Sequence, residues 1–368
     1  MLTYRADHVG SLLRPASLLE ARESWQAGRL PLEQLRAIEN RSILDALELQ
    51  RQAGIAVFSD GEFRRAHWGH GLLQSLQGVV SMPAPDEARG RWQGPTASLA
   101  AATHPTREYA RARLTVAESF TRVEARFLKQ HAPGPFKVTL PSPSMFHRLY
   151  HPVWTRPIYD SPESLVDDLV TIYLRELDEL HRIGTPYIQL DSLRYGEIIE
   201  AAQQGRLDPP TAQRTLEHLV AVDNRLLARA RAASVTRAVH FCRGNHRSAW
   251  VISGGYESIA EMLFGAVDTD RFLLEYDTER AGGFEPLRFV PHGKMVVLGL
   301  ISTKSGALES IDDLCRRVDE ASRYVALEYL AISPQCGFAS TQLGNLLDQD
   351  QQRAKLALVA EVARKIWN

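Results

Sequence analysis

Short apolar runs alternate with long amphipathic segments along most of this 368-residue chain. The runs have the length of buried strands, and segments such as Leu32–Ala53 repeat apolar residues at helical spacing. Strands that alternate with helices predict an α/β fold, and about eight such units predict a (β/α)8 TIM barrel. The predicted strands are Thr3–Val9, Ile55–Phe58, Phe136–Leu140, Tyr187–Leu190, Ala238–Cys242, Arg271–Tyr276, Met295–Ile301 and Tyr329–Ser333.

A doubly wound sheet is the alternative to the barrel. The early strand–helix turns contain neither a GxGxxG motif nor a P-loop, which argues against a nucleotide-binding version of such a sheet. We expect a single barrel domain over residues 1–368, with an irregular insertion at about 63–135 and a further excursion after the third strand. Inside the insertion, apolar spacing predicts a helix near Arg107–Gln130.

Composition excludes several classes of protein. The net charge of −1 provides no field that would favour nucleic acid or an anionic membrane. The N-terminus lacks the apolar core of a signal peptide, and no apolar run is long enough to span a membrane. Three cysteines, an odd and sparse set, argue against a disulfide framework and for a reducing compartment. We therefore expect a cytoplasmic protein, and the sequence leaves open whether it is a monomer or a homodimer.

His240 and Cys242 lie two residues apart at the end of the fifth predicted strand. Alternation along a strand points such residues to the same side. An imidazole and a thiol placed together in this way are half of a zinc site. Two later strand ends offer the other half, Glu275 and Cys336, and the four residues form a mixed N/O/S set that zinc accepts.

Spacing alone favours a different interpretation, in which Cys242 and Cys336 are ordinary buried residues, because the candidate ligands are scattered rather than paired in CxxC clusters. A barrel reverses this preference, because residues just past the C-terminal ends of its strands converge on one face. The polar residues expected at that face are Ser11, Asp60, Glu62, Ser142, Asp191, His240, Cys242, Glu275, Ser302, Thr303, Lys304 and Cys336.

Other candidates have weaker support. His246 could replace Glu275 as a ligand, although a contact to a ligand or to the substrate is the better interpretation. Cys315 lies one helical turn after Ile311 and is better explained by core packing. We expect Arg64 and Arg65 to be solvated. For Lys304, an anion contact and a solvent-facing side chain are equally supported.

At these residues the sequence resembles the catalytic domain of cobalamin-independent methionine synthases, and it is closer still to their short single-domain relatives. The resemblance covers nearly the whole chain and is strongest from His240 onward. The segments that carry it are HVGSLLRP, SDGEF, HFCRGNHRSAW, GGYESIAEMLF, FLLEYDTERAGGFEPLR, VVLGLISTKSGALE and SPQCGFAST, in this order.

The resemblance implies a barrel with a catalytic zinc ion held by His240, Cys242, Glu275 and Cys336. It implies that the amino-acid part of homocysteine binds at Gly10, Ser11, Glu62 and Asp191, and we add Ser302 as a strand-end contact to the substrate. The family often has a second acid directly after the aspartate, where this chain has Ser192. The long synthases also carry a second barrel without a counterpart in these residues, so folate binding does not follow from the resemblance.

The implied activity is transfer of a methyl group to the thiol of L-homocysteine to give methionine. The donor would be 5-methyltetrahydrofolate or a methylcorrinoid protein. We expect Glu62 and Asp191 to pair with the substrate ammonium, and Glu275 to loosen when the thiol enters. Three alternatives remain open: a zinc alkyltransferase for another thiol such as coenzyme M, a barrel with a closed structural zinc, and a zinc-free decarboxylase barrel for porphyrins.

Overall fold

The computed structural model describes residues 4–83, 92–101, 106–232 and 235–367. Thr3 and parts of the predicted insertion lie outside these ranges. The strands are β1 Leu76–Pro83, β2 Thr106–Val116, β3 Lys137–Pro141, β4 Tyr187–Ser192, β5 Thr236–Phe241, β6 Arg271–Glu275, β7 Met295–Ile301 and β8 Leu330–Pro334.

The helices α2 and α6 confirm two predicted segments. Helix α6 begins after Ser161, whose hydroxyl caps the first turn, and it ends at Gly184 in the left-handed conformation.

Within the described ranges, the helices lack the combination of length and apolarity that a membrane crossing needs. The α-helices are α1 Ala16–Gln26, α2 Leu32–Ala53, α3 His70–Ser75, α4 Ala97–Ala101, α5 Arg122–His131, α6 Pro162–Ile183, α7 Arg194–Gln203, α8 Pro209–Ala232, α9 Ala260–Ala266, α10 Ile311–Ser322 and α11 Gln349–Trp367. Short 3-10 helices are η2 Pro143–Leu149, η3 Glu279–Ala281, η4 Glu285–Phe289 and η5 Leu327–Tyr329.

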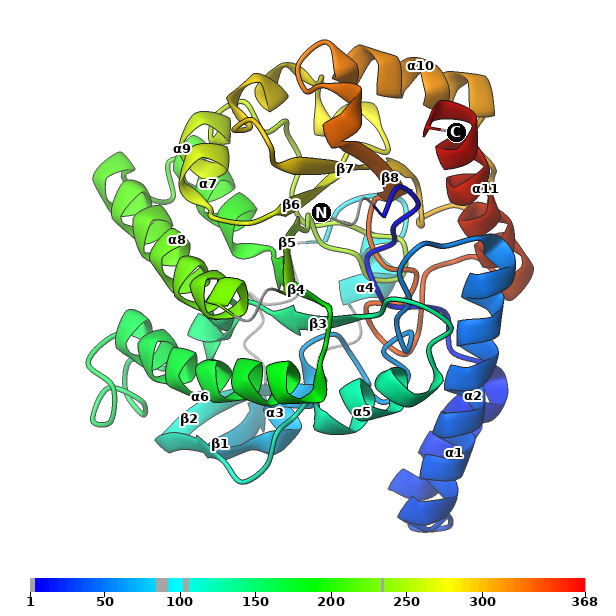
Figure 1. The fold of residues 1–368 in the computed structure, drawn as a ribbon. Helices are drawn as coiled ribbons and strands as arrows, with labels where there is room; N and C mark the ends of the chain where they lie inside the picture. Colours follow the sequence, from blue (N-terminus) through cyan, green and yellow to red (C-terminus); the bar gives the residue numbers. More distant parts are fainter. Residues whose placement is uncertain (1–3, 84–91, 102–105, 233–234, 368) are drawn as a thin grey trace.

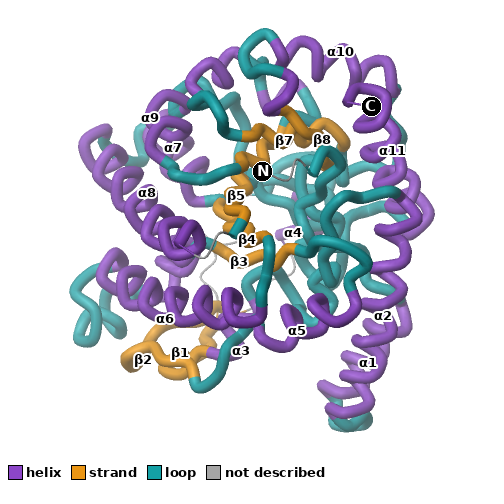
Figure 2. Tube along the Cα trace, viewed as in Figure 1, coloured by secondary structure: helices purple, strands orange, loops and turns teal. Residues whose placement is uncertain are grey.

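Strands β3 to β8 form one six-stranded parallel sheet in chain order, and the larger helices form a ring outside it (Figures 1 and 2). Six predicted strands and the α/β class are thereby confirmed. The two edges of the sheet are joined by isolated bridges, from Ala6 to Ile332 of β8 and from Phe58 to Phe136. The Ala56 N–H donates to the Ala6 carbonyl at 2.9 Å, which completes the ring. We call this closed ring of strands the barrel.

The first two predicted strands are thus reduced to bridges. In the first segment only Arg5 and Ala6 accept backbone hydrogen bonds from neighbouring strand segments, while the carbonyl groups on either side of them accept from buried side chains. The Val9 carbonyl accepts from Gln189 Nε2 at 2.7 Å, and the Tyr4 carbonyl accepts from the Arg271 guanidinium at 3.0 Å. Lys137 Nζ donates to the His8 carbonyl.

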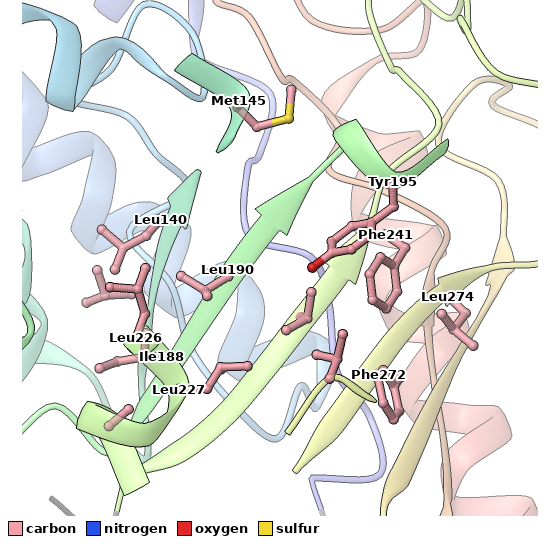
Figure 3. Close-up of a cluster of buried hydrophobic side chains, with 14 of the residues drawn as sticks. Leu140, Met145, Ile188, Leu190, Tyr195, Leu226, Leu227, Phe241, Phe272 and Leu274 are labelled. Carbon is pink, nitrogen blue, oxygen red and sulfur yellow. The ribbon is translucent and has the colours of Figure 1, made fainter. Parts of the chain in front are cut away.

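Alternation along the strands separates two apolar layers. Residues such as Leu190, Phe241 and Leu274 belong to the outer layer, and in Figure 3 Leu190 lies toward Leu226 and Leu227 of α8, while Phe241 and Leu274 lie toward Phe272. The other set points into the barrel and includes Tyr187, Ala238, Leu273, Val297 and Ala331. Since His240 and Cys242 share the parity of Ala238, and Glu275 shares that of Leu273, these three candidate ligands belong to the inner layer.

The predicted helix near Arg107–Gln130 is wrong in its first half. Residues Thr106–Val116 form β2, which pairs antiparallel with β1, and only α5 is helical. Arginine, alanine and leucine favour helices, but tertiary contacts override this preference. The Leu114 N–H donates to the Tyr159 hydroxyl at 2.8 Å, and the Ala110 carbonyl accepts from the Thr155 hydroxyl at 2.8 Å.

Candidate metal centre

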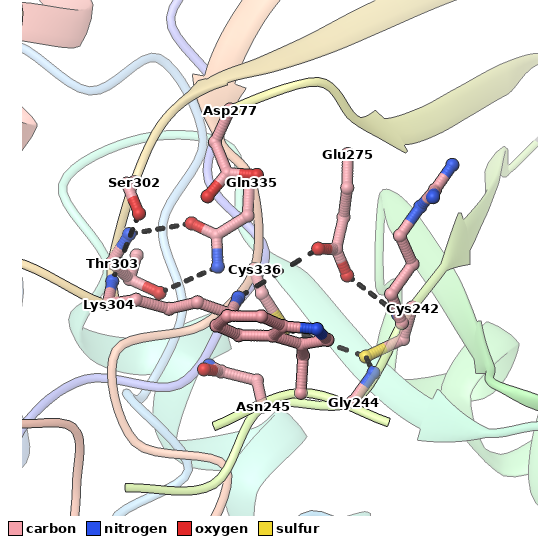
Figure 4. Close-up of polar contacts among 12 residues, drawn as sticks. Cys242, Gly244, Asn245, Glu275, Asp277, Ser302, Thr303, Lys304, Gln335 and Cys336 are labelled. Atoms are coloured by element: carbon pink, nitrogen blue, oxygen red, sulfur yellow. Dashed lines mark hydrogen bonds and ion pairs between the residues drawn. The ribbon is translucent and has the colours of Figure 1, made fainter. Parts of the chain in front are cut away.

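The structure brings His240, Cys242, Glu275 and Cys336 together. His240 lies on β5, Cys242 follows it, Glu275 ends β6, and Cys336 follows β8. One ligand atom from each residue lies within 4.8 Å of the others, and the two sulfur atoms are 3.7 Å apart. Figure 4 shows the side chains of Cys242, Glu275 and Cys336 converging from different strand ends.

Neighbouring groups orient these ligands. His240 Nδ1 lies 3.3 Å from the Leu273 carbonyl, which can only accept, so Nδ1 is the donor and Nε2 is the ring atom left for a cation. Glu275 Oε1 accepts from the Arg243 backbone N–H at 2.7 Å, and Cys242 Sγ accepts from the Gly244 N–H at 3.3 Å. His240 and Glu275 are thereby each oriented through one atom, while His240 Nε2 and Glu275 Oε2 are left for a cation.

The cluster fits a zinc ion. In the described part of the chain, His240 Nε2 and Glu275 Oε2 are buried without a hydrogen-bond partner, which is costly unless something binds them. The Cys242 thiol and the neighbouring His240 hold the pKa of Cys336 well below its ordinary value, which favours a thiolate. Two sulfurs, one imidazole and one carboxylate are a donor set typical of zinc.

The alternative ligands lie elsewhere. His246 Nδ1 is 3.1 Å from the Thr341 hydroxyl, and its ring contacts Trp92, so it is outside the cluster. Cys315 packs against the hydrophobic core from α10. The position of Cys315 agrees with the packing role that the sequence favoured, and the expected contact of His246 to a ligand or to the substrate stays a prediction.

Two predicted substrate residues, Glu62 and Asp191, are carboxylic acids, and Asp191 interacts electrostatically with His240 and Cys336 of the cluster and with Glu62. Glu62 Oε1 accepts from the Thr139 hydroxyl at 2.8 Å, while its Oε2 is buried without a hydrogen-bond partner among the described residues. Glu62 also has a φ of +59°, a strained value for a residue other than glycine. Burial raises the pKa of both carboxyls, that of Asp191 to about 7. Such groups are suited to receive a cation.

Gly10 and Ser11 lie where other loops approach closely. A Cβ atom on Gly10 would lie 2.8 Å from Thr139 Cγ2 and 3.4 Å from Glu62 Oε1, so only glycine fits beside this carboxyl. A Cβ atom on Gly337 would lie 1.9 Å from Ser11 Oγ, which places Ser11 against the loop that carries Cys336. Ser302 is placed differently, because its N–H donates to Glu309 and its hydroxyl accepts from the Lys304 N–H.

Arg65 is not solvated as the sequence suggested. Its side chain is buried and pairs with Glu124 at 2.5 Å, and it lies 3.6 Å from Glu62 Oε1. Arg64 is also largely covered and pairs with Glu39 at 3.2 Å. The spacing of three residues between Glu62 and Arg65 was an available signal, because it permits such a pair within a turn.

A second network joins the two cysteine-bearing loops. The Asn245 side-chain amide donates to the Gly337 carbonyl at 2.6 Å, and Asn345 donates to Asn245 Oδ1 at 2.9 Å. The Thr303 N–H donates to Gln335 Oε1 at 2.6 Å. Sequence patterns do not predict these contacts, because they join residues far apart in the chain.

Ser192, which replaces the second acid of the family, points away from the cluster. Its hydroxyl is buried without a hydrogen-bond partner in the described structure. It lines a pocket of about 460 Å³, partly open to solvent, together with Tyr195, Phe241, Cys242 and Tyr256. The substitution therefore changes the outer side of β4 rather than the metal-facing side.

A largely buried cluster of two cysteines, a histidine and a glutamate at the C-terminal ends of parallel strands fits a metal site in an α/β protein. The chain belongs to the family described as cobalamin-independent synthase, catalytic domain, whose model matches residues 5–365.

Relatives extend over nearly the full chain. YxjH, an uncharacterised protein of Bacillus subtilis, is 38% identical and is aligned over 99% of this chain and 95% of its own length. A candidate vitamin-B12 independent methionine synthase from Listeria monocytogenes is 31% identical, with a TM-score of 0.76 over 100% of this chain and 99% of that one. A B12-independent methionine synthase from Shewanella, solved with selenomethionine, is 22% identical, with a TM-score of 0.75 over 99% of this chain and 98% of that one. The last match shows the fold alone.

Proposed function

We propose that this chain is a zinc-dependent methyltransferase that methylates the thiol of L-homocysteine to give methionine. The observation that carries the proposal is that the buried Asp191 carboxyl interacts electrostatically with His240 and Cys336 of the cluster and also with Glu62, whose carboxyl is buried and partly unpaired in the described structure. The cluster suits a metal that binds thiolates, and the carboxyl suits an ammonium group. An amino-acid thiol carries both functions. The Shewanella relative was solved with selenomethionine, an analogue of the product.

When bound, zinc would supply a Lewis acid that removes the thiol proton and keeps electron density on sulfur. Two thiolate ligands and a carboxylate limit how strongly the ion withdraws that density. Glu62 and Asp191 would hold the ammonium through charge-assisted hydrogen bonds. Gly10 and Ser11 would hold the rest of the amino-acid part, and Ser302 would contribute from the neighbouring loop.

The reaction balances without an oxidant or a reductant. The thiol loses its proton, the thiolate sulfur forms a bond to the methyl carbon, and the donor keeps the electron pair of the bond that breaks. We propose 5-methyltetrahydrofolate or a methylcorrinoid protein as the donor. The three unpaired cysteines agree with the cytoplasmic location that we propose.

The second candidate is an alkyltransferase that acts on coenzyme M or a similar thiol. The metal cluster would suit that substrate equally well. A sulfonate, however, would meet the carboxyls of Glu62 and Asp191 and be repelled. The buried carboxyls therefore favour homocysteine.

The test is an assay of the purified zinc protein with L-homocysteine and each donor, with methionine measured by mass spectrometry. Coenzyme M replaces homocysteine in the control. Methionine formation with one of the two donors supports the proposal. Methylation of coenzyme M without methionine formation would favour the second candidate.

A further inference from the structure

Lys304 lies on the loop after β7, with its side chain about nine-tenths buried. Within the described ranges, its Nζ makes no hydrogen bond. The distance from Lys304 Nζ to Glu275 Oε2 is 3.9 Å. Figure 4 shows the Lys304 side chain extending toward Glu275. A buried ammonium group without a hydrogen bond is costly, which points to a partner that arrives during function.

The two oxygens of Glu275 have different surroundings. Oε1 is held by the Arg243 backbone N–H at 2.7 Å. Oε2 lies 3.6 Å from the Arg280 guanidinium and 3.9 Å from Lys304 Nζ, and both cations are about nine-tenths buried. Glu275 therefore lies between the other three ligands of the cluster and the two cations. A small rotation of its carboxylate about Oε1 would move Oε2 toward the ligands or toward the cations.

The charges of the cluster explain why such cations are needed. Two thiolates and a carboxylate around a divalent cation leave one net negative charge, and an entering substrate thiolate adds a second. In a buried site this excess is unfavourable unless one ligand leaves or positive charge lies nearby. Lys304 and Arg280 supply that charge. Arg280 also forms an ion pair with Asp277 at 3.4 Å, whereas Lys304 forms its ion pair with Glu275.

The backbone at Lys304 is fixed to the same framework as the ligands. Its N–H donates to the Ser302 hydroxyl at 3.3 Å, and the adjacent Thr303 is bound to Gln335, next to Cys336. Lys304 is therefore held in a defined position relative to the cluster.

We propose that Lys304, assisted by Arg280, is a positioning residue that receives the Glu275 carboxylate when the substrate thiolate enters the zinc ligand set. The proposal rests on the proposed function in one respect, because it assumes that a thiol is the entering ligand. Lys304 acts through Glu275 and sets how readily this ligand is released.

The experiment compares Lys304→Met with Lys304→Arg and with Lys294→Met. Lys294 precedes β7, pairs with Asp268 at 3.1 Å, and provides the same substitution at the opposite end of the strand. Zinc affinity is measured by competition with a chelator. Binding of L-homocysteine and of 3-mercaptopropylamine, which lacks the carboxylate, is measured by calorimetry on the zinc-loaded proteins.

We expect Lys304→Met to tighten thiol-free zinc binding and to weaken the binding of both thiols, each on the order of tenfold. Lys304→Arg should restore both values, and Lys294→Met should match the wild type. In a Glu275→Gln background, Lys304→Met should have no further effect on either quantity, because the proposed role runs through this carboxylate.

Two results would overturn the proposal. Weaker binding of homocysteine alone would mean that Lys304 holds the substrate carboxylate, and unchanged thiol binding would mean that it does not receive Glu275. If the wild type binds neither thiol, the proposed function fails, and the zinc measurements still decide the role of Lys304. In that case, the proposed role of Lys304 is wrong if Lys304→Met changes zinc affinity equally in the wild-type and the Glu275→Gln backgrounds.

Discussion

The two ends of the barrel interior contain buried charged groups on the same strands, but in opposite states. At the N-terminal end, Lys137 of β3 pairs with Asp7 at 2.8 Å, and Arg271 of β6 lies 3.4 Å from the other oxygen of that carboxyl. These side chains are fully buried. At the C-terminal end, Glu275 ends the strand that Arg271 begins, and its Oε2 is left without a hydrogen bond in the described structure.

The difference separates a structural cluster from a binding site. Around Asp7, cations and hydrogen bonds satisfy the carboxylate, including one from the Tyr187 hydroxyl at 3.1 Å. Around Glu275 and His240, buried atoms lack partners that a metal ion or a substrate would supply. The Asp7 and Glu275 carboxyls are equally buried, so the presence of partners and not burial distinguishes them.

The largest effect is expected at the metal end. Cys336→Ser should remove measurable turnover and lower zinc affinity by more than about a hundredfold, since it removes a direct ligand. The thermal midpoint of the zinc-free protein should stay close to that of the wild type. The matched control is Cys315→Ser in α10, which should keep zinc and activity. Full activity in Cys336→Ser would show that the site is misassigned.

At the opposite end, Lys137→Met should destabilise the fold by about 3–5 kcal/mol, because it leaves part of the Asp7 charge buried and uncompensated. Chemical denaturation measures the effect. The folded variant should still bind zinc with two cysteine ligands. Arg51→Met removes an exposed pair with Glu48 and should leave stability nearly unchanged, because solvent screens such a pair. Equal losses of stability in Lys137→Met and Arg51→Met would mean that the buried Asp7 cluster does not stabilise the fold more than an exposed pair.

Substitution of Asp191, the carboxyl beside the cluster, should weaken substrate binding and leave zinc binding unchanged. Asp191→Asn should raise the KM for homocysteine by about tenfold to a hundredfold, since it removes a charge-assisted contact. Zinc content should not change. If zinc is lost together with homocysteine affinity, Asp191 supports the metal ligands instead of the ammonium group.

Asp223 is a third kind of buried carboxyl. Hydroxyl groups are its partners, whereas Asp7 pairs with cations and Glu275 has an oxygen without a hydrogen bond among the described residues. Asp223 of α8 accepts from the Ser142 hydroxyl at 2.6 Å and from the Tyr195 hydroxyl at 2.8 Å. Burial raises its pKa to about 6, against an ordinary value of 3.8. The folded state therefore retains a proton that the unfolded chain loses, and this stabilisation disappears as the pH rises through about 6.

We expect wild-type stability to fall between about pH 4 and pH 7 by on the order of 1–3 kcal/mol relative to Asp223→Asn. Denaturation curves across this range measure the difference. Parallel curves for the two proteins would mean that the carboxyl is ionised in the folded state throughout.

The sequence predicted the parts of the molecule that depend on local periodicity. Strands β3 to β8 and helices α2 and α6 follow from apolar spacing and capping, and strand parity placed His240, Cys242 and Glu275 on one side. It did not predict β2, where pairing with β1 overrides helix propensity. It also misplaced Arg65, because a charged pair at positions 64 and 65 gives no sign of the buried Glu124 that receives it.

The most direct test of the central claim is zinc X-ray absorption on the wild-type protein, with and without L-homocysteine. The account predicts two sulfur ligands in the free enzyme and three after addition, with loss of one oxygen or nitrogen ligand. That result would establish an open site that activates a thiol. A zinc shell that keeps two sulfur ligands after homocysteine is added would contradict it.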